Sequence, residues 1–168
     1  MVSCGNNKEG SQDQGEVEID STAISYKALP PIASISKEKM NTISEWKKFR
    51  ELSILMERFQ RQDQGDLTYF AEEFSRLNEE LAKDSLIPEK FDKPAVKSRI
   101  MVLNTFSKQL KVRLEENAKL DSINLTRARV LNSYNALRLQ LAEHLKSKLF
   151  EEFLKKQDQN KATAKKSQ

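Results

Sequence analysis

The sequence predicts an all-α protein, an antiparallel up-down-up-down four-helix bundle, from its composition and from four amphipathic segments. Of the 168 residues, 32% are charged and 38% are hydrophobic, and Gly and Pro number only 4 each. Charge-rich, Gly-poor chains are usually helical, whereas sheet proteins need more turn residues and β-branched runs. Short connections between amphipathic helices favour antiparallel neighbours. The predicted bundle covers residues 37–156.

The first helix is predicted over residues 37–61 or 42–61. Its apolar residues recur at steps of three and four, which places them on one face of a helix. They are Met40, Ile43, Trp46, Phe49, Leu52, Met56 and Phe59. Ser36 can cap the earlier start, and the capping-box pattern at residues 42–45 can cap the later one.

The second predicted helix follows a short turn and ends before Pro88. In the turn, Gly65 suits the left-handed backbone that often follows a helix, and Asp66 suits the N-cap of the next one. The helix carries one apolar stripe, formed by Leu67, Phe70, Phe74, Leu77 and Leu81. The first two helices are therefore expected to be antiparallel neighbours.

The third predicted helix begins near Pro94, a residue that is favoured in the first helical turn. Its stripe consists of Val96, Ile100, Leu103, Phe106 or Ser107, Leu110 and Leu114. The pattern weakens over residues 117–121, and Asp121 or Ser122 can cap a fourth helix. The competing architecture fuses the third and fourth helices into one rod and implies a dimer, but the capping signal favours a break.

The fourth predicted helix is the longest and keeps its period almost to Lys156. Its stripe consists of Ile123, Val130, Tyr134, Leu137, Leu141, Leu145, Leu149 and Phe153. It can overhang the bundle by up to about ten residues. A second apolar set lies off this stripe and consists of Leu125, Leu131, Leu139, Phe150 and Leu154. We expect this set to widen the buried face; the alternative is an exposed patch for a partner.

Both ends of the chain are polar and are expected to lie outside the bundle. Residues 1–36 have the composition of a flexible acidic tether. The weak alternation of Val17, Ile19, Ile24 and Tyr26 also fits an extended arm along the body. Residues 157–168 are expected to form a disordered basic tail. No run of about 18 apolar residues exists, so no membrane-spanning helix is predicted.

The opening residues Val2, Ser3 and Cys4 carry one short motif. The aliphatic Val2 and the small Ser3 precede the cysteine, and the polar residues 5–10 follow it as a flexible tether would. This segment resembles the lipobox of bacterial lipoproteins, in which Leu usually occupies the position of Met1. The resemblance implies lipidation of Cys4. Cys4 is the only cysteine, so an internal disulfide is excluded. The alternative is an inert free thiol in an unfolded start.

The sequence predicts no catalytic and no metal site. One His and one Cys in the whole chain argue against zinc sites and against Ser-His-Asp or Cys-His catalysis. A di-metal bundle centre needs Glu-x-x-His on two helices, which the chain lacks. The paired acids (Glu79, Glu80, Glu115, Glu116, Glu151 and Glu152) are interpreted as solvated, and the arginines of the last two helices (Arg99, Arg113, Arg127, Arg129 and Arg138) as ordinary salt-bridge partners.

Haem is a less favoured alternative. Small four-helix cytochromes hold haem between a Met near the start of the first helix and a His near the end of the last, and Met40 and His144 occupy similar places. Each lies about 33 Å from the shared end of the predicted bundle, at 1.5 Å per residue. The chain has no Cys-x-x-Cys-His sequence for covalent attachment, and we expect no cofactor.

We therefore expect a non-enzymatic helical bundle in the bacterial cell envelope. Lipid on Cys4 would attach it to the membrane, and its role would be structural or the binding of a protein partner or small ligand. An apolar segment upstream of Val2 in the full-length gene would support export, whereas a natural start at Met1 would remove that support. The alternatives are a cytosolic helical adaptor with a basic tail, for which nucleic acid is a less favoured partner, and the haem protein.

Overall fold

The structure, a computed structural model, describes residues 24–164, except for the side chains of residues 146–149 and 160–164. These residues form five helices: α1 Lys37–Ser44, α2 Lys47–Arg61, α3 Thr68–Ala82, α4 Pro94–Glu115 and α5 Leu120–Ala164. The part of the chain that is described contains no strand, only an isolated bridge between Ser25 and Gln64. The predicted all-α class is confirmed, with five helices where four were predicted.

The predicted first helix is divided into α1 and α2 at Trp46. This residue has extended backbone, φ −73° and ψ 100°, and its side chain is only 2% exposed. Its indole N–H donates to Asp84 Oδ2 over 2.7 Å. Burying the indole with a hydrogen-bond partner stabilises the fold more than an unbroken helix would. Sequence periodicity cannot reveal this preference. The earlier start is confirmed, because Ser36 Oγ accepts from the backbone N–H of Lys39.

The turn between α2 and α3 has the predicted conformation. Gly65 has a φ of 83°, a left-handed backbone that a side chain would strain. The N-cap of α3 is Leu67, one residue after the predicted Asp66, but Asp66 Oδ1 still accepts from the backbone N–H of Thr68, the first residue of the helix, over 2.8 Å. The hydroxyl and the backbone N–H of Thr68 both donate to the Asp66 carboxylate and hold its pKa below its ordinary value. The hydroxyl contributes most.

The predicted break before the last helix is confirmed, and the fused-rod alternative is wrong. Asn117 adopts a left-handed φ of 49°, and the Ala118 N–H donates to Arg113 O over 2.9 Å. This pattern ends a helix by satisfying its last carbonyls. The next helix begins at Leu120, slightly earlier than either predicted cap, and Pro94 occupies the first turn of α4 as expected.

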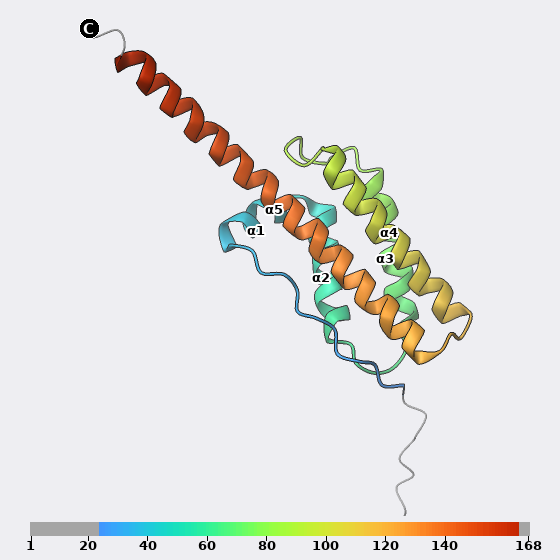
Figure 1. Cartoon of the computed structure of the whole chain (residues 1–168). Helices are drawn as coiled ribbons and strands as arrows, with labels where there is room; N and C mark the ends of the chain where they lie inside the picture. The colour runs from blue at the N-terminus through green and yellow to red at the C-terminus, as the bar shows by residue number, and fades with distance from the viewer. Residues whose placement is uncertain (1–23, 165–168) are drawn as a thin grey trace, which may run out of the picture.

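Helices α2 to α5 surround one apolar core. α4 packs against both α3 and α5, and α2 packs against α3. α2 meets α5 where Phe49 stacks on Tyr134 at 6.0 Å between ring centroids and Tyr134 Oη donates to Ser53 Oγ over 3.0 Å. Figure 1 shows α5 running along the whole body and continuing beyond it. No helix among the described residues is long and apolar enough to cross a bilayer.

The boundaries predicted for tether and tail need correction. Residues 24–36, here called the strap, lie along α5 with Tyr26 only 6% exposed, so this part of the predicted flexible tether is bound to the body. The extended arm that the alternation around Tyr26 predicts is confirmed for this segment. At the other end, the predicted disordered tail is helical over residues 157–164, because α5 continues to Ala164. Residues 1–23 and 165–168 of tether and tail lie outside the described residues.

Candidate functional site

The predicted lipidation residue, Cys4, lies outside the described residues. Lipid on this thiol therefore stays a prediction. What the structure adds is the place where the chain that follows Cys4 joins the folded body, at the start of the strap.

The two haem-ligand candidates have separate neighbours. Met40 Sδ lies 3.1 Å from Arg138 Nη1, whereas His144 Nε2 lies 3.4 Å from Gln140 Nε2 on its own helix. Arg138 and His144 are six residues apart, about 9 Å along the helix axis. A cation therefore occupies the position next to the sulfur, and the geometry gives no support to a shared iron.

The paired acids lie at the surface, as predicted, and those on α3 also form ion pairs, which were not predicted. Glu80 accepts from both Lys48 and Arg76, and Glu79 pairs with Lys108 at 3.0 Å. The bond from Lys48 contributes most to holding the pKa of Glu80 below its ordinary value, and the bond from Arg76 contributes next. Among the described residues no group of three or more His, Cys, Asp or Glu side chains could hold a metal ion.

A hollow of about 440 Å³ lies where α3 ends and α4 begins. Leu81, Ile87 and Ile100 form its apolar floor. Two lysines and two aspartates line it, so its formal charges balance; they are Lys83, Lys97, Asp84 and Asp92. A lining with balanced charges selects neither cations nor anions.

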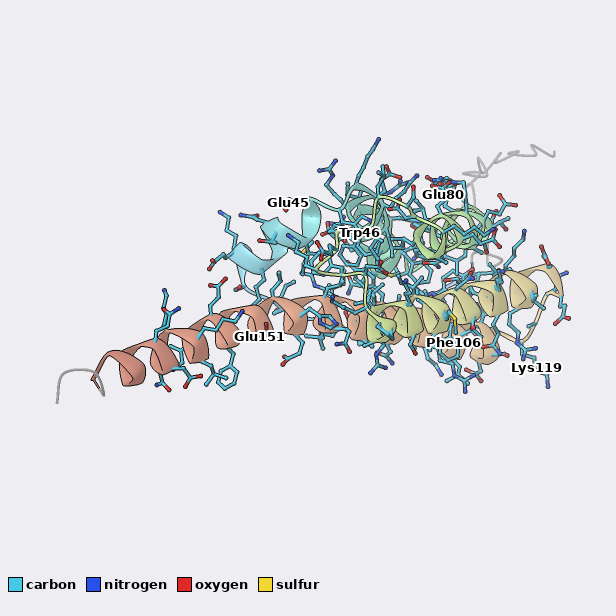
Figure 2. The ribbon with its side chains drawn as sticks, turned by 90° about the horizontal axis from the view of Figure 1, so that it is seen from above. Glu45, Trp46, Glu80, Phe106, Lys119 and Glu151 are labelled. Carbon is cyan, nitrogen blue, oxygen red and sulfur yellow. The ribbon has the colours of Figure 1, made fainter. Side chains whose placement is uncertain are left out.

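The last nineteen residues of α5, 146–164, project from the body and are called the arm. Among the side chains of α5 that the structure describes, Ala142 is the last that is buried, and Leu145 still packs against the core. At 1.5 Å per residue, the arm extends about 28 Å past that point. Figure 1 shows it clear of the other helices, and the view from above in Figure 2 agrees, with Glu151 labelled on it.

Large apolar side chains on the arm are exposed. Phe150 is 62% exposed, Phe153 56% and Leu154 42%. Their spacing of three and four residues places them on one side of the helix. A contiguous apolar face that no other part of the described chain covers is typical of an interaction surface.

The expectation of a wide buried face on the last helix is wrong for four of the five residues that suggested it. Leu131 is fully buried, but Leu125 and Leu139 are about half exposed, as are Phe150 and Leu154 on the arm. The cause is that the body covers only part of the surface of α5: α4, α1 and α2 pack against it, and the strap lies beside them. The alternative, an exposed apolar patch, is the one that the structure supports.

Polar side chains on α5 bind the strap through its backbone. Asn124 Oδ1 accepts from the Lys27 N–H over 3.0 Å, and Arg127 Nη1 donates to Lys27 O over 2.8 Å. Asn135 Oδ1 accepts from the Ala33 N–H over 2.8 Å, and Arg138 Nε donates to Ala33 O over 2.8 Å. Each Asn-x-x-Arg pair thus holds both backbone groups of one strap residue.

Arg127 is the most buried of these side chains, at 1% exposed. Its Nη2 donates to Gln62 O over 2.5 Å, and its guanidinium lies 4.6 Å from the Tyr26 ring centroid. Loss of hydration lowers its pKa from the ordinary arginine value. Carbonyl oxygens and aromatic faces therefore stand where a carboxylate was expected, and the interpretation of Arg127 and Arg138 as ordinary salt-bridge partners is wrong.

These strap contacts were missed at the level of sequence, although a signal is present. The sequence Asn-x-x-Arg occurs at 124–127 and again at 135–138, eleven residues later. Eleven residues are close to three helical turns, so both pairs lie on the same face. Because Asn and Arg are common on solvated helices, the repeat alone does not say that a backbone lies across it.

The strap gives the molecule a direction. It runs beside α5 in the same sense, so its first residues lie at the start of α5, where Lys27 Nζ pairs with Asp121 Oδ1 at 3.0 Å, and the arm lies at the opposite end (Figure 1). The chain therefore enters at one end of the body and presents its exposed apolar face at the other. Comparison with protein-family models, with curated proteins and with solved structures finds no match for this chain.

Proposed function

We propose that this chain is a non-catalytic binding protein of the bacterial cell envelope, attached to the membrane by lipid on Cys4. In this proposal α2 to α5 form an up-down-up-down bundle, and α1 is an additional short helix. The observation that carries the proposal is the arm, which holds Phe150, Phe153 and Leu154 in solvent beyond the last core residue. The arm would bind a protein partner in the cell envelope.

The physics of the arm supports a partner. A helix of this length is only marginally stable in water on its own, and helices in proteins gain most of their stability by packing an amphipathic face. Here the amphipathic face is present but no described segment packs on it. A partner that covered three large apolar side chains would supply that packing.

The position of the arm supports attachment at the other end. Acyl chains contribute about 0.8 kcal/mol per buried methylene, so a cysteine with several of them would stay in the membrane. Residues 5–23 can span up to about 65 Å when fully extended. With the strap at the start of α5, the bundle would then lie between the lipid and the arm.

Metabolic labelling with an alkyne fatty acid tests the attachment. The full-length gene, expressed in a bacterium, is expected to yield labelled protein in the membrane fraction. Cys4→Ala should abolish both the label and the membrane association, whereas the matched variant Ser3→Ala keeps a small residue beside the cysteine and should keep both. Unlabelled wild-type protein in the soluble fraction would contradict the proposal and favour the cytosolic adaptor.

Site-specific photo-crosslinking in the same cells tests the arm. A photoreactive residue at Phe153 should give a crosslinked product of one defined mass. The same residue at Lys155, exposed on a different side of the helix, should not. Equal products from both positions, or none from either, would contradict a specific contact on the apolar face.

A further inference from the structure

The two Asn-x-x-Arg pairs are spaced to match an extended backbone. Asn124 and Asn135 are eleven residues apart on α5, about 16 Å along the axis. Lys27 and Ala33, which they bind, are six residues apart, which an extended chain covers in up to about 20 Å. The strap is therefore held nearly straight between two fixed points on one helix.

The contacts at both points are to the backbone and engage both of its polar groups. At each point an asparagine accepts from the N–H and an arginine donates to the C=O of the same residue. Asn135 adds a third bond at its point, from Nδ2 to Pro31 O over 3.1 Å. Bonds from charged guanidinium groups are stronger than those between neutral groups.

The direction of the strap determines how these bonds would be loaded. A pull on the chain before residue 24, opposed by a pull on the arm, draws the strap and α5 past each other along the helix axis. All of the bonds then stretch together, and none can break first at low force. A pull between the strap and the start of α5 would instead open them one after another.

We propose that the two Asn-x-x-Arg pairs are a tension clamp, which passes force from the chain before the strap directly into α5. Force applied between the two ends of the molecule then bypasses α1 to α4, so the core does not unfold under it. This use of the clamp rests on the attachment at Cys4 proposed above. The contacts themselves do not, so the clamp can be tested on unlipidated protein.

Single-molecule pulling tests the clamp in two geometries. One handle is attached to Cys4, the only cysteine of the unlipidated chain, and the other to a C-terminal tag. In the second geometry the other handle is attached through Lys119→Cys, beside the start of α5. We expect the first extension in the end-to-end geometry to need at least twice the force of the first extension in the second geometry.

Variants assign the resistance to the clamp. The double variant Asn135→Ala/Arg138→Met should reduce the end-to-end force to nearly that of the second geometry. The matched control, Asn132→Ala/Arg129→Met, changes the same residue types on exposed parts of α5 that form no hydrogen bond or ion pair with the described strap residues. It should leave the force unchanged.

Equal forces in the two geometries, or a clamp variant that resists as the wild type does, would overturn the proposal. Hydrogen exchange covers the case in which the double variant unfolds. The amide protons of Lys27 and Ala33 should exchange at least tenfold more slowly than those of Ser34 and Lys37 in the wild type. Unprotected amides at both clamped residues would equally overturn the proposal. Failure of fatty-acid labelling at Cys4 would leave all of these results unchanged and would remove only the membrane as the source of the force.

Discussion

Residues 120–145 of α5 and the arm, residues 146–164, belong to one continuous helix, yet different interactions determine their structure. The first part buries Tyr134, Leu137 and Leu141 completely and binds the strap on a neighbouring face. The arm exposes every large side chain that is described on it. Helical backbone therefore continues about 28 Å beyond Leu145, the last described side chain of the helix that packs against the core. The end of a core and the end of a helix are thus set separately.

The largest expected difference between the two parts comes from one pair of matched leucines. Leu137→Ala removes a fully buried side chain and should lower the free energy of unfolding by about 2–5 kcal/mol, because it leaves a cavity. Leu154→Ala on the arm should change it by about 0.5 kcal/mol or less. Urea denaturation measures both. A large loss from the arm variant would show that the arm packs on the body.

Removing the buried guanidinium is the next largest test. Arg127→Met leaves Lys27 O and Gln62 O without their donor, and an unsatisfied buried carbonyl costs about 1–3 kcal/mol. We expect a loss of about 2–4 kcal/mol by urea denaturation and faster proteolysis within the strap. Arg129→Met, on an exposed part of the same helix, is the control. Similar losses in both variants would contradict a special role for the strap contacts.

Alkaline pH provides a smaller test of the same part of α5. Burial raises the pKa of the Tyr134 phenol above its ordinary value of 10.0. The neutral form is therefore favoured in the folded state; this stability is fully present below pH 10 and is lost as pH rises through the folded pKa. Tyr134→Phe removes the bond to Ser53 and should lower the free energy of unfolding by about 1 kcal/mol at pH 8. Above pH 10, the free energy of unfolding of this variant should decline less steeply than that of the wild type. A parallel decline in both proteins, measured by urea denaturation from pH 8 to pH 11, would contradict this.

The smallest expected effect comes from removing the whole arm. A chain that ends at Leu145 should change the free energy of unfolding by about 0.5 kcal/mol or less, because every arm side chain that the structure describes, those of residues 150–159, is exposed. Circular dichroism should show a loss of helical signal in proportion to the residues removed. If the body aggregates or unfolds without the arm, the arm is part of the cooperative folding unit.

Local signals in the sequence were sufficient for most helix boundaries. Gly65, Asp66, Pro94 and the weak stretch around Asn117 each act through a backbone preference or a cap within a few residues. Such preferences operate before any tertiary contact forms, so they can be recognised without one. The break at Trp46 could not be predicted, because its cause is Asp84, thirty-eight residues away.

The candidate interaction sites depended more heavily on long-range structure. Periodicity found Phe150 and Leu154, but it could not decide between a buried and an exposed face, because that depends on how many sides of α5 the body covers. The strap contacts join residues about one hundred positions apart, such as Ala33 and Asn135. The sequence of the strap alone does not specify that it binds α5, and the sequence of α5 alone does not specify that it binds the strap.

The amino-acid sequence by itself determined the helical class, most of the helix ends and the apolar stripes, since these follow from composition, periodicity and local caps. Only the tertiary structure decided that the first helix breaks at Trp46, that residues 24–36 lie on α5, and that the arm stands free. The physical reason is that burial and backbone hydrogen bonding over long separations depend on which surfaces meet. A periodic pattern names the residues available for contact, and the fold determines which of them are covered.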